Sequence, residues 1–157
     1  MDQQADCVLC QGRAGDEQML RVEVWEDELW RLTMAIASET PGFSYLEPKR
    51  HITDITRLDG PETATLGATL ARATAALREV TGVERVYIYV FGDGVAHLHL
   101  HLAPHRPGDA LNDQMIRGEL TTQTLPSGAT LIASKEFPPL PEAELRAVAE
   151  RVRVRLA

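Results

Sequence analysis

The segment His97-Leu98-His99-Leu100-His101-Leu102 alternates histidine with leucine. Because successive side chains of a β-strand point to opposite faces of the sheet, this alternation predicts a strand with histidines on one face and leucines on the other. The leucine face would pack on the core, and the three imidazoles would lie about 6–7 Å apart along the strand. Neutral imidazole is a nucleophile, a base and a metal ligand, and imidazolium binds anions. Two functional interpretations stay open, a metal cage and a site that handles a phosphate.

Strand, turn and helix signals precede the histidine segment. Residues 85–91 (RVYIYVF) are rich in β-branched and aromatic side chains, which favours a strand. Gly92-Asp93-Gly94 then forms a tight turn into a strand predicted over residues 95–103. Further upstream, a helix is predicted over residues 61–81 and ends at Gly82. Its apolar stripe recurs at spacings of three and four: Leu66, Leu70, Ala73, Leu77 and Val80.

The remaining patterns complete an α+β fold. Residues 18–37 alternate apolar and polar side chains around a polar turn, which predicts a hairpin, and residues 43–47 form a short strand. Residues 104–128 are predicted as loop, and residues 129–133 as a strand. A final helix follows Pro141, with one apolar side made of Leu145, Val148, Val152 and Leu156. The expected architecture is an antiparallel sheet with a central helix, plus a C-terminal extension that ends in a helix.

Composition and charge exclude several classes of function. The chain has 157 residues, 16 Lys plus Arg and 23 Asp plus Glu, which gives a net charge of −7. A nucleic acid polymer is therefore not an expected partner, because phosphate neutralisation needs clustered basic side chains. No stretch approaches the roughly 20 apolar residues of a membrane span, and the N-terminal residues (MDQQADC) lack the features of a signal peptide. We expect a cytoplasmic protein without a membrane partner, in which disulfides are disfavoured.

Cys7 and Cys10 form a C-x-x-C motif that needs another explanation. Such a loop offers two thiolates to one tetrahedral zinc ion, with two further ligands from elsewhere in the chain, and His51 is a candidate third ligand. A pair without a function is the second interpretation. A redox role is the third, although a redox motif normally opens a helix after a strand in a thioredoxin-like unit, which this sequence does not resemble.

Residues 97–103 fit the H-φ-H-φ-H-φ-φ signature, and the chain resembles the histidine triad (HIT) superfamily. Pro48-Lys49-Arg50-His51-Ile52 resembles the P-K-x-H-I segment of that family, and Gly42 lies six residues before Pro48 as in the family. The predicted order of helix, strand and triad strand is also similar. The resemblance covers about residues 5–107. We therefore predict a HIT-like domain over residues 1–107, including the cysteine pair, and a C-terminal extension over residues 108–157 packed on the same domain.

The resemblance implies an activity and catalytic roles. Family members cleave nucleotides at the α-phosphate, as hydrolases or nucleotidyl transferases, through a covalent nucleotidyl-histidine. The middle histidine attacks, so His99 is the predicted nucleophile, and His101 matches the histidine that contacts the phosphate and helps the leaving group. Covalent catalysis of this kind divides one hard displacement into two easier ones. The expected small-molecule partner is a nucleotide: a nucleoside phosphoramidate, a nucleotidyl-sulfate or a dinucleoside polyphosphate.

The resemblance also implies a metal set. In branches with an N-terminal C-x-x-C, which include galactose-1-phosphate uridylyltransferase, the cysteines and two histidines bind zinc. Transferred residue by residue, the ligands are Cys7, Cys10, His51 and His97. The zinc would hold the N-terminus against the catalytic strand, which is a structural role and not Lewis-acid catalysis.

Several positions depart from the family pattern. Many members carry Gly-Gln-Ser or Gly-Gln-Thr shortly before the triad, where this chain has Asp93 and Gly94, so only the backbone N–H of Gly94 is left as a phosphate donor. The family's histidine after Gly42 is Phe43 here, and Glu39 is the acid nearest to the ribose-binding position.

Other candidate ligand contacts come from position alone. Trp25 and Met34 are candidate walls of a nucleoside pocket, with a core role as the competing interpretation. Arg106 and Arg117 are candidates for distal phosphates, although a solvated arginine is the commoner case.

Two functional alternatives stay open beside the enzyme. The loss of the phosphate donors suggests a non-catalytic nucleotide-binding protein, and a metallohydrolase would use the triad itself as metal ligands. Family members often form homodimers by joining two sheets edge to edge, for which residues 83–91 and the tail from residue 105 are candidates.

Overall fold

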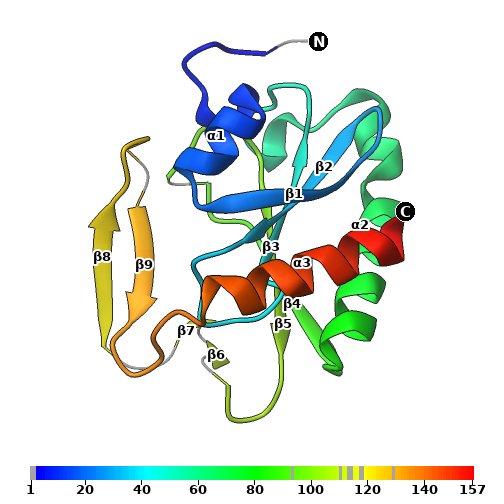
Figure 1. Cartoon of the computed structure of the whole chain (residues 1–157). Coiled ribbons are helices and arrows are strands. Elements are labelled where there is room, and N and C mark those ends of the chain that lie inside the picture. Colours follow the sequence, from blue (N-terminus) through cyan, green and yellow to red (C-terminus); the bar gives the residue numbers. More distant parts are fainter. Residues whose placement is uncertain (1–2, 93, 110, 113–114, 117–118, 129) are drawn as a thin grey trace.

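The computed structural model describes residues 3–92, 94–109, 111–112, 115–116, 119–128 and 130–157 (Figure 1). Its centre is a five-stranded sheet in the order β1-β2-β3-β5-β4, with every neighbouring pair antiparallel. The strands are β1 (Arg21–Glu26), β2 (Trp30–Ala35), β3 (Ser44–Pro48), β4 (Arg85–Tyr89) and β5 (Leu100–His105). The first two strands form the predicted hairpin. The expected α+β fold class is confirmed.

Two helices cover one face of this sheet (Figure 1). They are α2 (Gly60–Thr81) and α3 (Glu142–Leu156), which contact each other. Leu98, Leu100 and Leu102 are buried in the core beneath them, as the alternation predicts. The predicted apolar side of the last helix is buried as well. The helix α2 begins with a proline in its first turn and ends where Gly82 adopts the left-handed conformation at φ 71°, which glycine adopts without strain.

The N-terminal segment, for which the sequence predicts no helix or strand, folds into two short helices. They are η1 (Val8–Gln11), a 3-10 turn that holds the cysteine pair, and α1 (Arg13–Gln18). Gly15 allows the two helices to pack closely, because a Cβ at this position would lie only 1.9 Å from the carbonyl oxygen of Val8. The side chain of Asp16 on α1 is buried and bonds to Arg21 and Arg31 of the first two strands. Short helices of this kind depend on tertiary contacts and leave little periodicity in the sequence.

The C-terminal extension contains more strand than the sequence indicates. The predicted strand over residues 129–133 is β9 (Thr130–Ser134), and it pairs with β8 (Leu120–Thr124). The prediction of loop over residues 104–128 is therefore wrong for β8, and also for the two-residue strands β6 (Leu111–Asn112) and β7 (Met115–Ile116). The residues of β8 are all exposed, so the strand carries no buried alternation that would mark it in the sequence.

A short 3-10 turn, η2 (Ile55–Arg57), connects β3 with α2. Among the described residues, no helix is both long and apolar enough to cross a membrane.

Candidate metal centre and histidine site

The histidine segment divides into two parts. The regular strand β5 begins at Leu100, not at the predicted residue 95, because the backbone N–H groups of His97 and Leu98 donate to the carbonyl oxygens of Val95 and Ile52. The ring of His97 packs edge-on against His51 at a centroid distance of 5.1 Å. The rings of His99 and His101 lie 5.2 Å from each other. The first imidazole therefore belongs to a different cluster from the other two.

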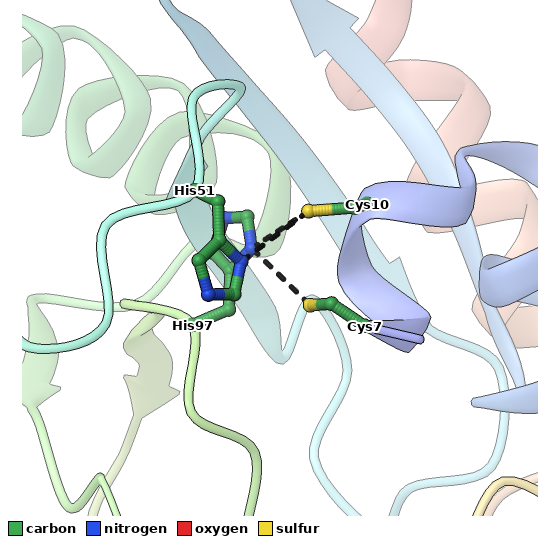
Figure 2. Close-up of side chains that lie close together, drawn as sticks. All are labelled: Cys7, Cys10, His51 and His97. Atoms are coloured by element: carbon green, nitrogen blue, oxygen red, sulfur yellow. Dashed lines mark hydrogen bonds between the residues drawn. The ribbon is translucent and has the colours of Figure 1, made fainter. Parts of the chain in front are cut away.

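Figure 2 shows that first cluster, in which Cys7, Cys10, His51 and His97 point toward one another. One potential ligand atom from each of these four residues lies within 4.8 Å of all the others. The Nδ1 atom of His97 is 3.5 Å from Sγ of Cys7 and 3.4 Å from Sγ of Cys10, and Nδ1 of His51 is 3.5 Å from Sγ of Cys10. Zinc bonds of about 2.3 Å to sulfur and 2.0–2.1 Å to nitrogen, at tetrahedral angles, require a sulfur-to-nitrogen distance of about 3.6 Å. The spacing fits a metal ion coordinated by all four residues.

Hydrogen bonding prepares His97 as a ligand. Its Nε2 atom lies 2.8 Å from the carbonyl oxygen of Pro48, which can only accept, so Nε2 carries the proton. In the neutral ring the lone pair is then on Nδ1, the atom that faces the two sulfurs. Burial lowers the pKa of His97, which favours the neutral form that binds metals. A backbone carbonyl on the second ring nitrogen is the usual support of a metal-bound histidine.

The thiol of Cys10 needs a compensating charge before it can serve as a thiolate. Burial raises its pKa, and the neighbouring Cys7 raises it further. A cation bound among the four side chains would reverse this effect, because metal binding displaces the thiol protons.

The second cluster has the opposite tautomer. The Nδ1 atom of His99 lies 2.6 Å from the carbonyl oxygen of His97, and Nδ1 of His101 lies 3.3 Å from that of Tyr89. Both Nδ1 atoms therefore donate, and each neutral ring keeps its lone pair on Nε2. An imidazole with a fixed Nδ1–H and a free Nε2 is arranged to act as a nucleophile or as a base.

Aromatic rings surround His101. The register of β5 places Tyr45 of β3 and Tyr89 of β4 opposite it on the two sides, and the Tyr89 ring stacks on the imidazole at 5.0 Å. Phe91 and Phe43 lie at 5.2 Å and 5.9 Å. Burial, together with a smaller contribution from the nearby His99, lowers the pKa of His101 to about 4. The imidazole of His101 is therefore neutral at physiological pH.

A pocket of about 260 Å³ opens beside these rings. Its walls come from the segment after β2, from the aromatic rings around His101, and from the C-terminal strands β8 and β9. Glu39 lines it, and burial raises the pKa of this carboxyl group. The remaining wall is largely apolar, with Leu120, Leu131 and Ile132 contributed by the hairpin.

Comparison with known proteins assigns the family. The model of the HIT domain matches residues 17–108. The chain belongs to the HIT domain family. Uncharacterised HIT-like proteins from two strains of Mycobacterium tuberculosis are 31% identical to it over 112 residues, which is 68% of this chain and 76% of theirs.

Solved structures share the fold. A histidine triad protein from Bradyrhizobium japonicum aligns with a TM-score of 0.69 at 20% identity, covering 90% of this chain and 94% of that one. A zinc-bound histidine triad family protein from Mycobacterium smegmatis aligns at 0.61 and 21% identity, covering 96% and 94%. A uridylyltransferase aligns at 0.58 and 18% identity, covering 96% of this chain and 46% of that one.

The HIT domain does not bring every predicted contact residue to the histidines. Met34 is fully buried in the core under the helices, and Trp25 packs against that core beneath Arg72 of α2, whose guanidinium lies 5.1 Å from the ring. Both belong to the helix-covered face of the sheet, so the competing core interpretation describes them, and we do not carry them into a nucleotide site. Successive side chains of a strand point to opposite faces, so Met34 points to the core while its neighbour Ala35 lines the pocket.

The other predicted contacts are separated from one another. Glu39 lies in the pocket beside His101, whereas Gly94 lines a different cavity together with Cys7 and His51. Arg106 donates to the carbonyl oxygen of Thr81 and lines a different cavity. Asp93 and Arg117 lie outside the described residues.

Three aromatic residues that line the pocket beside His101 are not among the predicted site residues: Tyr45, Tyr89 and Phe91. The signal was present, because the alternation in residues 85–91 places Tyr89 and Phe91 on one face of the strand. The sequence does not assign this face to a functional site, because a sequence shows neither the partner strand nor the register of the pairing.

Proposed function

We propose that this HIT domain is a nucleotide hydrolase or nucleotidyl transferase that acts at the α-phosphate through His99. The observation that carries the proposal is the hydrogen bond of 2.6 Å from Nδ1 of His99 to the His97 carbonyl oxygen, which orients the ring and leaves the lone pair on Nε2. Membership of the family supports a nucleotide as the small molecule. We propose nucleoside phosphoramidates, nucleotidyl-sulfates or dinucleoside polyphosphates as substrates, with Glu39 in the pocket beside His101 as an additional contact.

The proposed reaction has two displacements. In the first, Nε2 of His99 attacks the α-phosphorus, a P–N bond forms, and the bond to the leaving group breaks with its electron pair. The leaving group takes up a proton from water, and the His99 ring, which keeps its Nδ1–H, carries the positive charge of an imidazolium, so the imidazole is a good leaving group in the second displacement. In the second, water or another acceptor hydroxyl attacks phosphorus and a P–O bond forms while the P–N bond breaks; the electron pair returns to Nε2 of His99, and the acceptor's proton goes to water.

We propose zinc as the ion of the four-residue cluster, in a structural role. A zinc ion there would supply no bond-making chemistry; it would tie η1 to the segment that holds His97. The carbonyl oxygen of His97 accepts the hydrogen bond that orients His99. By fixing His97, the cluster would therefore also fix the direction in which His99 points. The backbone connection gives the metal a positioning effect without contact with the substrate.

The test uses adenosine 5′-phosphoramidate and diadenosine polyphosphates with the purified chain. His99→Ala should lower the turnover rate by at least about 10³-fold. His101→Asn should accumulate a covalent nucleotidyl adduct on His99, detected by intact-protein and peptide mass spectrometry. His105→Asn is the matched control, because His105 lies at the far end of β5, where its ring stacks on Tyr87 and pairs with Asp109. This variant should keep its activity. Full turnover in His99→Ala would exclude the proposed mechanism.

A non-catalytic nucleotide-binding protein is the second candidate. Neutral His101 and the loss of the Gln and Ser/Thr phosphate donors favour it. It predicts that AMP raises the melting temperature while no substrate is consumed. The triad metallohydrolase is disfavoured, because within the described residues His97 is the only triad member in the metal cluster.

A further inference from the structure

We propose that the pocket beside His101 binds an organic ammonium group, with the Glu39 carboxylate as its counter-charge and the rings of Tyr89 and Phe91 as part of its wall. This inference deepens the proposed function: among the proposed substrates it favours phosphoramidates whose leaving amine carries an organic ammonium group, because the sulfate and polyphosphate leaving groups of the others are anionic. The link to a phosphate rests on the proposed reaction, whereas binding of the cation does not require it.

Charge is the first argument. The described lining of this pocket includes one carboxylate and no lysine or arginine. Glu39 is half-buried, and no Lys or Arg of the described ranges forms an ion pair with it. Burial raises the pKa of its carboxyl group, because the pocket hydrates the ionised form less well than bulk water does. A bound cation would supply that partner, and an anion would be repelled.

The aromatic wall is the second argument. The faces of aromatic rings attract ammonium groups through their quadrupoles, and the attraction grows when water is excluded. Phe91 is 47% exposed, so its ring is accessible to a ligand. Tyr89 lies 4.9 Å from Phe91 and stacks on His101. The neutral imidazole adds no positive charge that would oppose the cation.

Size and position give the third argument. A volume of about 260 Å³ accepts a small alkylammonium group with part of its chain. Leu131 and Ile132 of β9 close the pocket on the side of the C-terminal hairpin and present apolar surface to the alkyl carbons. With no cationic side chain in this lining, a phosphate has no partner inside the pocket and stays near Nε2 of His99. The pocket therefore selects the group beyond the phosphate.

The test compares choline with its uncharged isostere 3,3-dimethylbutan-1-ol, in binding to the whole metal-loaded chain followed by calorimetry and by NMR shifts of aromatic protons. We expect choline to bind at least fivefold more tightly than the alcohol and to shift the ring signals of Tyr89 and Phe91. Equal affinity of the two probes, or no binding of choline, would overturn the proposal.

Two variants locate the site. Glu39→Gln should lower choline affinity at least fivefold and leave the affinity for the alcohol unchanged, whereas the matched control Glu28→Gln, in the exposed β1–β2 turn, should bind choline as the wild type does. Phe91→Leu keeps apolar bulk and removes the aromatic face, and it should also weaken choline alone. Choline binding unaffected by both pocket variants would contradict the proposal. These measurements need no turnover, so a failed His99 mechanism and a failed cation site give different results.

Discussion

At the scale of single residues, backbone carbonyl groups decide the chemistry of each triad imidazole. His97 donates from Nε2 to Pro48, which leaves Nδ1 for the cluster with Cys7 and Cys10. His99 donates from Nδ1 to His97 and keeps Nε2 free. The same residue type therefore takes two tautomers two positions apart. A sequence can show that three histidines recur in this pattern, but it cannot show which nitrogen of each ring is protonated.

The pKa of His101 gives a prediction at this scale. Its value of about 4 in the folded chain lies below the ordinary 6.5. The stabilisation from keeping the ring neutral is therefore fully present above about pH 6.5 and is lost as the pH falls toward 4, by about 3 kcal/mol. In long-range NMR correlations of the imidazole, we expect His101 to stay a neutral Nδ1–H tautomer at pH 5. Urea unfolding of His101→Asn should lose correspondingly less stability between pH 6.5 and 4 than the wild type, and a His101 midpoint near 6.5 would contradict this prediction.

The cysteine–histidine cluster gives a second prediction at this scale. Elemental analysis of the purified chain should find one equivalent of zinc, and Cys7→Ser and His51→Asn should lower its content. Loss of the ion should lower the melting temperature by several degrees, since each kcal/mol of lost stability is worth about 2–4 °C for a chain of this size. His105→Asn is the control outside the cluster and should keep its zinc. A wild-type chain without zinc, together with unchanged stability of Cys7→Ser, would remove the proposed metal site.

At the scale of elements, α1 is attached to the sheet by buried charges. Arg21 makes two hydrogen bonds of 2.9 Å to Glu47 and one of 2.9 Å to Asp16, and Arg31 bonds to the same two carboxylates. The Arg21, Asp16 and Glu47 side chains are at most 5% exposed. Buried charges of this kind are stable only as a complete set. We therefore expect the short helix to depend on Asp16.

Removing one partner tests this dependence. Asp16→Asn leaves two buried guanidinium groups with one fewer counter-charge, which should cost about 3–5 kcal/mol of unfolding free energy. Glu17→Gln, next to it on α1 with a side chain 69% exposed, is the matched control and should stay within about 0.5 kcal/mol of the wild type. Both are measured by urea unfolding of the zinc-saturated chain. A cost below 1 kcal/mol for Asp16→Asn would show that the network does not hold α1.

Elements with strong local signals were predicted closely. The helix expected over residues 61–81 is α2, and the strand expected over residues 85–91 is β4 with its end at Tyr89. The start of β5 was placed too early, because the residues before Leu100 make hydrogen bonds to Val95 and Ile52 in place of a strand ladder. α1 and β8 were missed because each depends on partners distant in the sequence.

In the candidate site too, residues set by local sequence motifs could be predicted, whereas residues brought together by strand pairing could not. The four metal-cluster residues come from motifs with fixed spacing, so the resemblance named them, and the structure brings them together. The aromatic cluster needs the register that sets Tyr45 and Tyr89 opposite His101, and that register forms only when three strands assemble.

At the scale of the whole molecule, one face of the sheet packs on helices and the other face carries the candidate site. The helices α2 and α3 cover the leucine face (Figure 1). The other face of the strands carries the aromatic rings of the pocket and the buried ion pairs of Asp16 with the first two strands. β4 is the last strand of the sheet order, so its outer edge has no partner strand among the described residues. Unprotected edges invite pairing with another chain.

Edge pairing of two β4 strands is therefore the assembly we propose for this chain. The exposed apolar residues at and after β4 support it: Ile88 is 47%, Val90 38% and Phe91 47% exposed. Light scattering coupled to gel filtration should give a dimer mass for the wild type and a monomer mass for Ile88→Lys, because a buried lysine at the joined edge would lose its hydration. Ile55→Lys, in η2 with a wild-type isoleucine that is 44% exposed, is the matched control and should stay dimeric. A monomeric wild type, or dissociation by both lysine variants alike, would assign these apolar side chains to another role.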